Sequence, residues 1–293
     1  MEKFHSHYSV GALCTALDVS KSGFYAHCQK PSRPRRRRDA HLRELVLRSF
    51  AESRRTYGSP RVLADLRAWG ERCGKNRIAR LMRQEGLCAR QKRRFTPRTT
   101  DSRHPHPIAP NWLAKVPAAD RPGQIWVSDF TYLPTAEGWL YLAFTLDACS
   151  RKVVAHHTRE DMRAELVTTT FTQAIQRERP PAGLLHHSDR GSQYACAAFQ
   201  KCLAAWRVTP SMSRPGNPYD NAMAESFVAT LKTECFGHAL PPSKAAAKLL
   251  AFDYIHCFYN PRRRHSSLAY RSPIEFEKSI VPPESSTLTS TIL

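Results

Sequence analysis

Three acidic residues stand where carboxylates are hard to explain as surface groups. Asp129 lies in the middle of the apolar, β-forming run Gln124–Leu133. Asp189 follows the short apolar run Leu184–His187, and Glu225 lies inside a stretch with helical spacing. An ionised carboxylate in an apolar run is costly unless paired, and three converging carboxylates raise one another's pKa values until a divalent metal ion relieves the repulsion. Because oxygen-only ligands favour Mg²⁺ or Mn²⁺, these residues predict a metal site for phosphoryl transfer, in which two ions activate a nucleophile and stabilise the leaving oxygen.

The segments around these residues alternate between strand and helix patterns. Period-two alternation with β-branched and aromatic residues predicts four strands, and helical periodicity predicts three helices. Adjacent strands followed by a crossover helix and a further strand indicate an α/β fold with a mixed sheet. The predicted strands span residues 124–133, 139–146, 152–157 and 184–187, and the predicted helices span 163–177, 195–206 and 219–235.

The N-terminal third holds most of the positive charge. The 293-residue chain has 45 Lys and Arg against 25 Asp and Glu, and residues 1–100 hold 24 of the basic and 8 of the acidic side chains. Phosphate neutralisation with counterion release favours a polyanion partner. The chain has no long amphipathic stretch for a membrane surface, so nucleic acid is the expected partner. A merely solvated basic surface is the plain alternative.

The same third has the pattern of short helices joined by turns. Residues 10–17 and 21–29 have helix-turn-helix spacing, and helices are also expected over 41–52, 61–69 and 75–85. In the last helix Ile78, Leu81 and Met82 can pack inward, which leaves a basic face outward. A basic second helix after a short turn is typical of major-groove readers, although a solvated helical bundle would look similar. The predicted DNA-contacting residues are Arg61, Lys75, Asn76, Arg77 and Arg80.

A proline-rich stretch divides the two halves of the chain. Residues 96–122 contain six prolines, so this segment cannot form a regular element and marks a domain boundary. The predicted organisation is a helix-turn-helix-like segment at 1–30, a basic linker at 31–40, a helical DNA-binding domain at 41–95, the proline-rich linker at 96–122, an α/β core at 123–278 and a disordered tail at 279–293.

The three acidic residues also belong to longer motifs. These are Trp126-Val-Ser-Asp129-Phe-Thr131-Tyr132, His187-Ser-Asp189-Arg-Gly191-Ser-Gln193-Tyr194 and Asn221-Ala-Met-Ala-Glu225-Ser-Phe227, followed by Leu231-Lys232-Thr-Glu234 and by a segment from Tyr259-Asn260 through Arg263 and His265 to Leu268, Pro273 and Phe276. Together they resemble the catalytic core of the DDE transposases, specifically the OrfB-type proteins of the insertion-sequence-three family, which are kin to retroviral integrases. The departures, such as Ala269 in place of a usual glycine, leave the carboxylates untouched.

The resemblance implies a fold and a set of site residues. The fold would be a ribonuclease H-like mixed five-stranded sheet with flanking helices, with Asp129 on its first strand, Asp189 at the end of its fourth and Glu225 on a later helix. Asn221 and Lys232 share a helix face with Glu225 and would orient substrate and hold a DNA phosphate, although an exposed helix face explains them equally well. Arg263 and His265 would contact DNA, or else form part of a solvated basic turn.

The resemblance also implies a transposase that carries out metal-dependent DNA cleavage and strand transfer. Two Mg²⁺ or Mn²⁺ ions would bind per site when DNA is present. The expected partners are the element's terminal inverted repeats and target DNA, an upstream OrfA-type protein joined by frameshifting, and further copies of the chain, in the bacterial cytoplasm at the nucleoid. A catalytically silent DNA-binding regulator and a plain metal-dependent nuclease are the alternatives.

Other features exclude several protein classes. Nine scattered cysteines without a CxxC pair argue against a zinc ribbon or thioredoxin motif and for reduced thiols. No apolar run reaches the roughly 18 residues that a membrane helix needs. His186 and His187 lie beside Asp189, but histidines at a strand end are expected to be structural.

Overall fold

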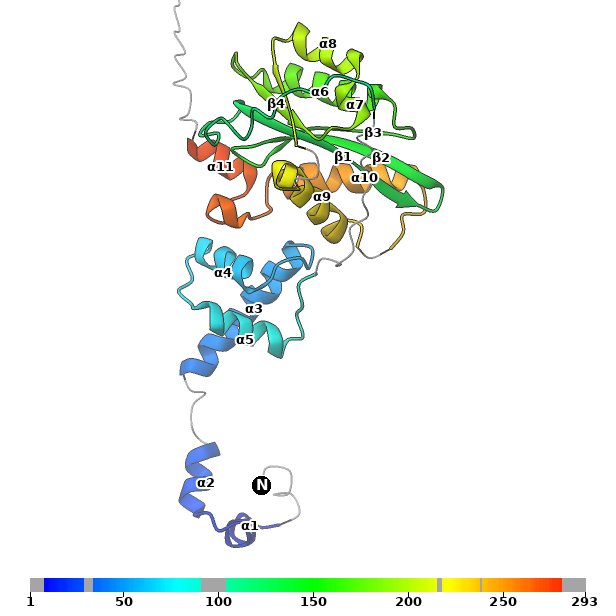
Figure 1. Cartoon of the computed structure of the whole chain (residues 1–293). Helices are drawn as coiled ribbons and strands as arrows, with labels where there is room; N and C mark the ends of the chain where they lie inside the picture. The colour runs from blue at the N-terminus through cyan, green and yellow to red at the C-terminus, as the bar shows by residue number, and fades with distance from the viewer. Residues whose placement is uncertain (1–7, 29–33, 91–103, 215–217, 238, 281–293) are drawn as a thin grey trace, which may run out of the picture. The chain divides into compact units, whose positions relative to one another are not determined.

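The chain forms two compact units, one helical and one α/β (Figure 1). The structure, a computed structural model, describes residues 8–28, 34–90, 104–214, 218–237 and 239–280. The first unit comprises Met1–Glu52 and Gly58–Cys88, and the second comprises Ser53–Tyr57 and Ala89–Leu293. Within the described ranges, no helix is both long and apolar enough to span a membrane.

The helical unit contains α1 (Val10–Ala16), α2 (Lys21–Cys28), α3 (Pro34–Glu52), α4 (Ser59–Ala68) and α5 (Lys75–Gln84). The last three pack on one another through buried aliphatic and aromatic side chains, because each carries apolar residues at helical spacing. The predicted inward face of α5 is confirmed. Its buried residues are Ile78, Leu81 and Met82.

The boundaries of the predicted linkers change in the structure. Helix α3 begins at Pro34, inside the stretch that we predicted to be a basic linker at 31–40. Proline is tolerated in a first helical turn and arginine is a good helix former, so the basic run continues the helix instead of tethering it. Residues 104–122 contain neither helix nor strand, as predicted, while 96–103 lie outside the described residues. The predicted tail also lies outside them from residue 281 onward.

The α/β unit is built on a mixed five-stranded sheet in the order β3-β2-β1-β4-β5. β1 (Ile125–Thr135), β2 (Gly138–Asp147) and β3 (Val153–Arg159) form an antiparallel meander. β4 (Leu185–Ser188) pairs parallel to β1, and β5 (Thr209–Met212) pairs parallel to β4. The ribonuclease H-like arrangement that the resemblance implied is therefore confirmed. The strand pattern by itself identified four of these strands and missed β5.

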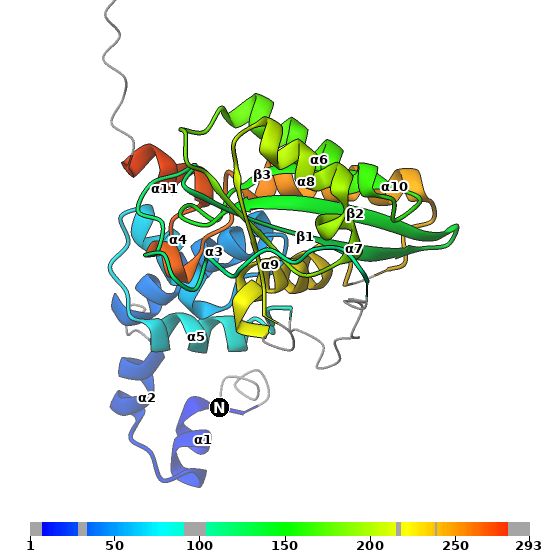
Figure 2. The same ribbon diagram turned by 45° about the horizontal axis from the view of Figure 1, so that its top comes forward.

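Helices cover both faces of this sheet (Figure 2). On one face lie α6 (Ala164–Glu178), α7 (Ser192–Ala195) and α8 (Ala197–Ala205), where the sequence predicted one helix over 195–206. Trp126 of β1 packs there against Phe171 of α6, with ring centroids 6.3 Å apart. On the other face lie α9 (Ala222–Glu234), which follows the short 3-10 turn η1 (Pro218–Asn221), and α10 (Lys244–Asp253).

The chain after α10 completes the second face. It continues as a π-helical segment, η2 (Tyr254–Tyr259), then a 3-10 turn, η3 (Ser266–Leu268), and α11 (Pro273–Ile280). Phe227 of α9 contacts Phe144 of β2 at 4.5 Å and Tyr259 of η2 at 4.9 Å between ring centroids. These aromatic contacts fix α9 against the sheet, where the helix also packs on β1.

Candidate active site

The strand register brings Asp129 and Asp189 together. β1 and β4 pair with a constant offset, Ile125 opposite Leu185 and Val127 opposite His187. Continued two residues beyond the last pair, this offset leads to Asp129 on β1 and to Asp189, the residue that follows β4. The charge of Asp189 acts on the Asp129 carboxyl, so two residues that are 60 positions apart in the sequence come close together just past the end of the ladder.

Both carboxylates face the side of the sheet that α9 covers. Successive side chains of a strand point to opposite faces. On β1, Trp126 and Phe130 contact α6 and α7 through Phe171 and Tyr194, so Asp129 faces the other way. Helix α9 packs on β1 on that side and carries Glu225 in its first turn. Asp129 on β1, Asp189 just after β4 and Glu225 on α9 therefore lie around one region of the sheet.

This arrangement changes the pKa of the Asp129 carboxyl. Burial and then the charge of Asp189 raise the pKa of the Asp129 carboxyl well above its ordinary value, and Glu225 adds to the rise. The Phe130 N–H donates a 2.8 Å hydrogen bond to Asp129 Oδ1, which opposes the shift, as does the charge of Lys232. Asp189 Oδ1 accepts from the Gly191 N–H at 2.9 Å. The site thus holds more negative charge than its own donors balance.

The residues fit a hard divalent cation. Asp129 and Asp189 offer only oxygen ligands and repel each other without a cation between them. Mg²⁺ is commonly held by one or two carboxylates together with substrate phosphates. Glu225 is exposed, and among the described residues no three His, Cys, Asp or Glu side chains lie close enough to bind one ion. Asp129 and Asp189 are thus a pair of neighbouring carboxylates, with Glu225 near them on α9.

Comparison with known proteins identifies the family. Residues 119–218 and 206–273 match Integrase core domain families, and residues 36–95 match an HTH-like domain. The chain is 40% identical over 266 residues to the "Insertion element IS600 uncharacterized 31 kDa protein" of Shigella sonnei, covering 91% of this chain and 97% of the relative. It is 37% identical over 279 residues to "Transposase InsF for insertion sequence IS3A" of Escherichia coli, covering 94% and 96%. The chain belongs to the IS3 transposase family.

The solved structures that are similar to this IS3-family chain include viral integrases. The "simian T-cell lymphotropic virus intasome in complex with PP2A regulatory subunit B56 gamma" is 16% identical with a TM-score of 0.46, covering 85% of this chain and 80% of that one. The "HTLV-2 integrase catalytic core domain in complex with magnesium (trimeric form)" is 15% identical with a TM-score of 0.42, covering 54% and 99%.

Asn221 and Lys232, which we predicted to contact DNA, lie beside and on α9. Asn221 is the residue that precedes α9, and its buried Oδ1 has no hydrogen-bond partner among the described residues. Lys232 is half-buried two turns after Glu225, where burial lowers the pKa of its ammonium group despite the charge of Asp129. Lys232 therefore lies close enough to Asp129 for the two charges to interact.

Arg263, a predicted DNA contact, is buried in this structure, so the exposed position that the prediction assumed is not found. Its side chain is 4% exposed and donates two 2.7 Å hydrogen bonds, from Nε and Nη2, to the Glu234 carboxylate. His265 is half-buried, with its ring 5.0 Å from that of Tyr259 and its Nε2 3.3 Å from Arg263 Nη1. A local basic run predicted exposure, whereas a partner 29 residues earlier draws Arg263 into the interior.

The predicted DNA-contacting residues of the helical unit divide into two groups. Lys75 and Asn76 are exposed at the start of α5, and Arg61 is half-buried on α4. Arg77 and Arg80 instead bind Asp39 of α3, at 2.7 and 2.9 Å, and hold the pKa of that carboxyl below its usual range. The described surface of the unit is thus less basic than its composition suggests.

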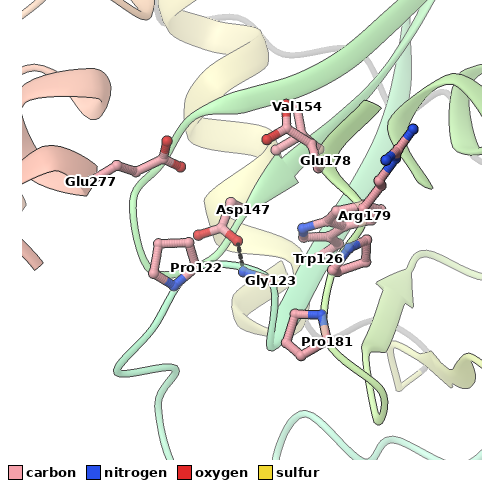
Figure 3. A pocket seen from close by; sticks show the side chains of 10 residues that line it. Pro122, Gly123, Trp126, Asp147, Val154, Glu178, Arg179, Pro181 and Glu277 are labelled. Carbon is pink, nitrogen blue, oxygen red and sulfur yellow. Dashed lines mark hydrogen bonds between the residues drawn. The ribbon is translucent and has the colours of Figure 1, made fainter. Parts of the chain in front are cut away.

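The two histidines beside Asp189 have structural roles. His186 Nε2 lies 2.8 Å from Ser128 Oγ, and His187 is bracketed by the hydroxyls of Ser211 and Ser213, so both histidines are structural. A pocket lined by Trp126, Asp147, Glu178 and Glu277 (Figure 3) contains none of the three candidate carboxylates. Its Asp147 accepts a 2.7 Å bond from the Gly123 N–H and so shapes the turn into β1.

Proposed function

We propose that the chain catalyses DNA strand cleavage and strand transfer that depends on Mg²⁺ or Mn²⁺, with Asp129, Asp189 and Glu225 as its catalytic carboxylates. The parallel pairing of β1 with β4, the packing of α9 on β1 and the charge interaction of Asp129 with Asp189 and Glu225 support this best. Family membership supports it independently. A site that gathers unbalanced negative charge is poorly suited to binding DNA phosphate unless cations enter with the substrate.

Each site residue has a proposed role that follows from its position. Asp129 and Asp189 would hold the metal, and Glu225 would join them from α9 when DNA is bound. Two divalent ions would activate the attacking oxygen on one side of the phosphorus and stabilise the leaving oxygen on the other. Lys232 holds a phosphate at the rim. Water first cleaves at an element end and frees a 3′-hydroxyl, which then attacks another phosphodiester, so one P–O bond forms as another breaks at each step.

In this proposal the helical unit binds DNA. Arg61, Lys75 and Asn76 contact DNA from α4 and α5, while Arg77 and Arg80 contribute only by leaving Asp39. The element's terminal repeats and the target DNA are the substrates, in the bacterial cytoplasm. An upstream OrfA-type partner fused by frameshifting and further copies of the chain complete the assembly. The competing proposal is a regulator that binds DNA without catalysis.

The test compares the wild-type chain with Glu225→Gln on duplexes that carry the element's ends, with binding measured in parallel. Glu165→Gln is the matched control, since Glu165 is also exposed in a first helical turn, that of α6. Wild type and the control should nick and join DNA with Mg²⁺ or Mn²⁺, while Glu225→Gln binds and does neither. Free ends without joining would indicate a nuclease. Binding without any reaction, even with the upstream partner, would indicate the regulator.

A further inference from the structure

A buried carboxylate anchors the C-terminal end of α9. Glu234, the last residue of that helix, is 7% exposed. Besides the two bonds from Arg263, its Oε2 accepts a 2.7 Å hydrogen bond from the Tyr254 hydroxyl, and its backbone carbonyl accepts one from Arg90. Charge-assisted bidentate bonds between planar groups fix orientation as well as distance. The end of α9 is therefore held in one orientation against η2 and the turn that follows it.

The turn that carries Arg263 is itself locked by a second buried hydroxyl. Tyr57 is 2% exposed and belongs to the α/β unit through the segment Ser53–Tyr57. Its hydroxyl donates to the Arg262 carbonyl at 3.1 Å and accepts from the Arg264 N–H at 2.7 Å. One side chain thus ties together the residues on either side of Arg263.

These contacts act on the helix that carries Glu225. Glu234 follows Glu225 by nine positions, which corresponds to about 14 Å along a rigid helix. A rotation or shift at the Glu234 end is therefore transmitted to Glu225. Stability alone does not explain the pair, because replacing a buried ion pair by apolar residues of similar volume is often neutral or stabilising.

We propose that Glu234 and Arg263 are positioning residues of the transposase site, and that Tyr57 locks the turn from which Arg263 reaches Glu234. The array sets the orientation of α9 and thereby the place of Glu225 relative to Asp129 and Asp189. This inference rests on the proposed function. It assigns to Arg263 a role inside the protein in place of the DNA contact predicted from its motif.

The central test is a double replacement, Glu234→Leu with Arg263→Met, next to Arg263→Met alone. The single variant leaves a buried carboxylate without its partner and should lower Tm strongly, whereas the double variant should recover most of it. We expect the double variant to bind terminal-repeat DNA with unchanged Kd and unchanged salt dependence, yet to cleave with kcat about tenfold to hundredfold lower, as for a misplaced catalytic group. Lys244→Met with Glu160→Gln, which removes a more exposed ion pair of the same unit, is the matched control and should keep wild-type kcat.

Tyr57→Phe gives a second, conservative test that keeps the ring and removes only the hydroxyl. It should leave Kd unchanged, lower kcat, and speed amide hydrogen exchange of α9. A double variant with recovered Tm and wild-type kcat would overturn the proposal, as would Tyr57→Phe with wild-type kcat and exchange. A weaker Kd with a salt slope reduced by about one in Arg263→Met would restore the DNA-contact reading. If the wild type proves inactive, the proposed function fails, while the exchange of α9 amides still tests the positioning.

Discussion

Neutralising Asp129 should stabilise the protein while abolishing its reaction. At the roughly 4.8 Å spacing of neighbouring strands, two unit charges repel by about 3 kcal/mol at an effective dielectric constant of about 20. Both aspartates keep some exposed surface, so solvent screens part of this and we expect Asp129→Asn to gain about 1–2 kcal/mol. Asparagine keeps the oxygen that accepts from the Phe130 N–H, so the local backbone hydrogen bond is preserved.

The sign of the pH dependence follows from the direction of the shift. The native pKa of Asp129 lies above its ordinary value of 3.8, so the folded chain holds a proton that the unfolded chain has lost. The wild-type free energy of unfolding therefore falls as pH rises from that value to the native pKa, and Asp129→Asn lacks this contribution. Mg²⁺ should reduce the difference in stability between Asp129→Asn and the wild type, because the ion stabilises the wild type more than the variant.

Urea denaturation in a chelator, repeated at several pH values and then with Mg²⁺, measures these differences. Asp220→Asn is a control of opposite sign. Hydrogen bonds from the Arg214 side chain, from its backbone N–H and from Asn111 lower the pKa of Asp220 to about 2. Removing the Asp220 charge should therefore cost about 1 kcal/mol of stability, since solvent screens the exposed Arg214. An Asp129→Asn protein that is less stable than wild type in chelator, or that keeps the same pH slope, would refute the reasoning.

Three further outcomes are expected. Burial lowers the pKa of His186 to about 3, so the free energy of unfolding should fall as pH drops from about 6.5 toward that value. For His186→Gln, denaturation curves at several pH values should show that this free energy changes less steeply with pH, by up to about 1.4 kcal/mol per pH unit. Equal pH dependence in variant and wild type would contradict this. Phe227→Ala removes the ring that stacks on Phe144 and should cost about 3–5 kcal/mol in urea denaturation, with a loss below 1 kcal/mol counting against the packing argument. Lys75→Ala should weaken DNA binding at low salt and reduce the salt slope by about one, with Tm unchanged, whereas an unchanged slope would exclude a phosphate contact.

The sequence pattern was sufficient where a residue's environment depends on its immediate neighbours. Alternation along Gln124–Leu133 and the apolar run before Asp189 predicted both strands, and helical spacing around Phe227 predicted α9. It failed for β5, because Thr209-Pro-Ser-Met is four residues long, contains a proline and has no alternation to detect. It also read the arginines after Pro34 as a linker, since charge says little about whether a segment is helical.

The sequence by itself determined that three carboxylates occupy strand and helix positions typical of a metal site, since those patterns are local. Only the tertiary structure decided that Asp129 lies close to Asp189, because a sequence does not state which strands pair when they are about 60 residues apart. Likewise, only the fold shows that Arg263 points inward to Glu234. A buried ion pair depends on where two distant segments meet, and an arginine in a basic run has the same local pattern whether it faces DNA or a carboxylate.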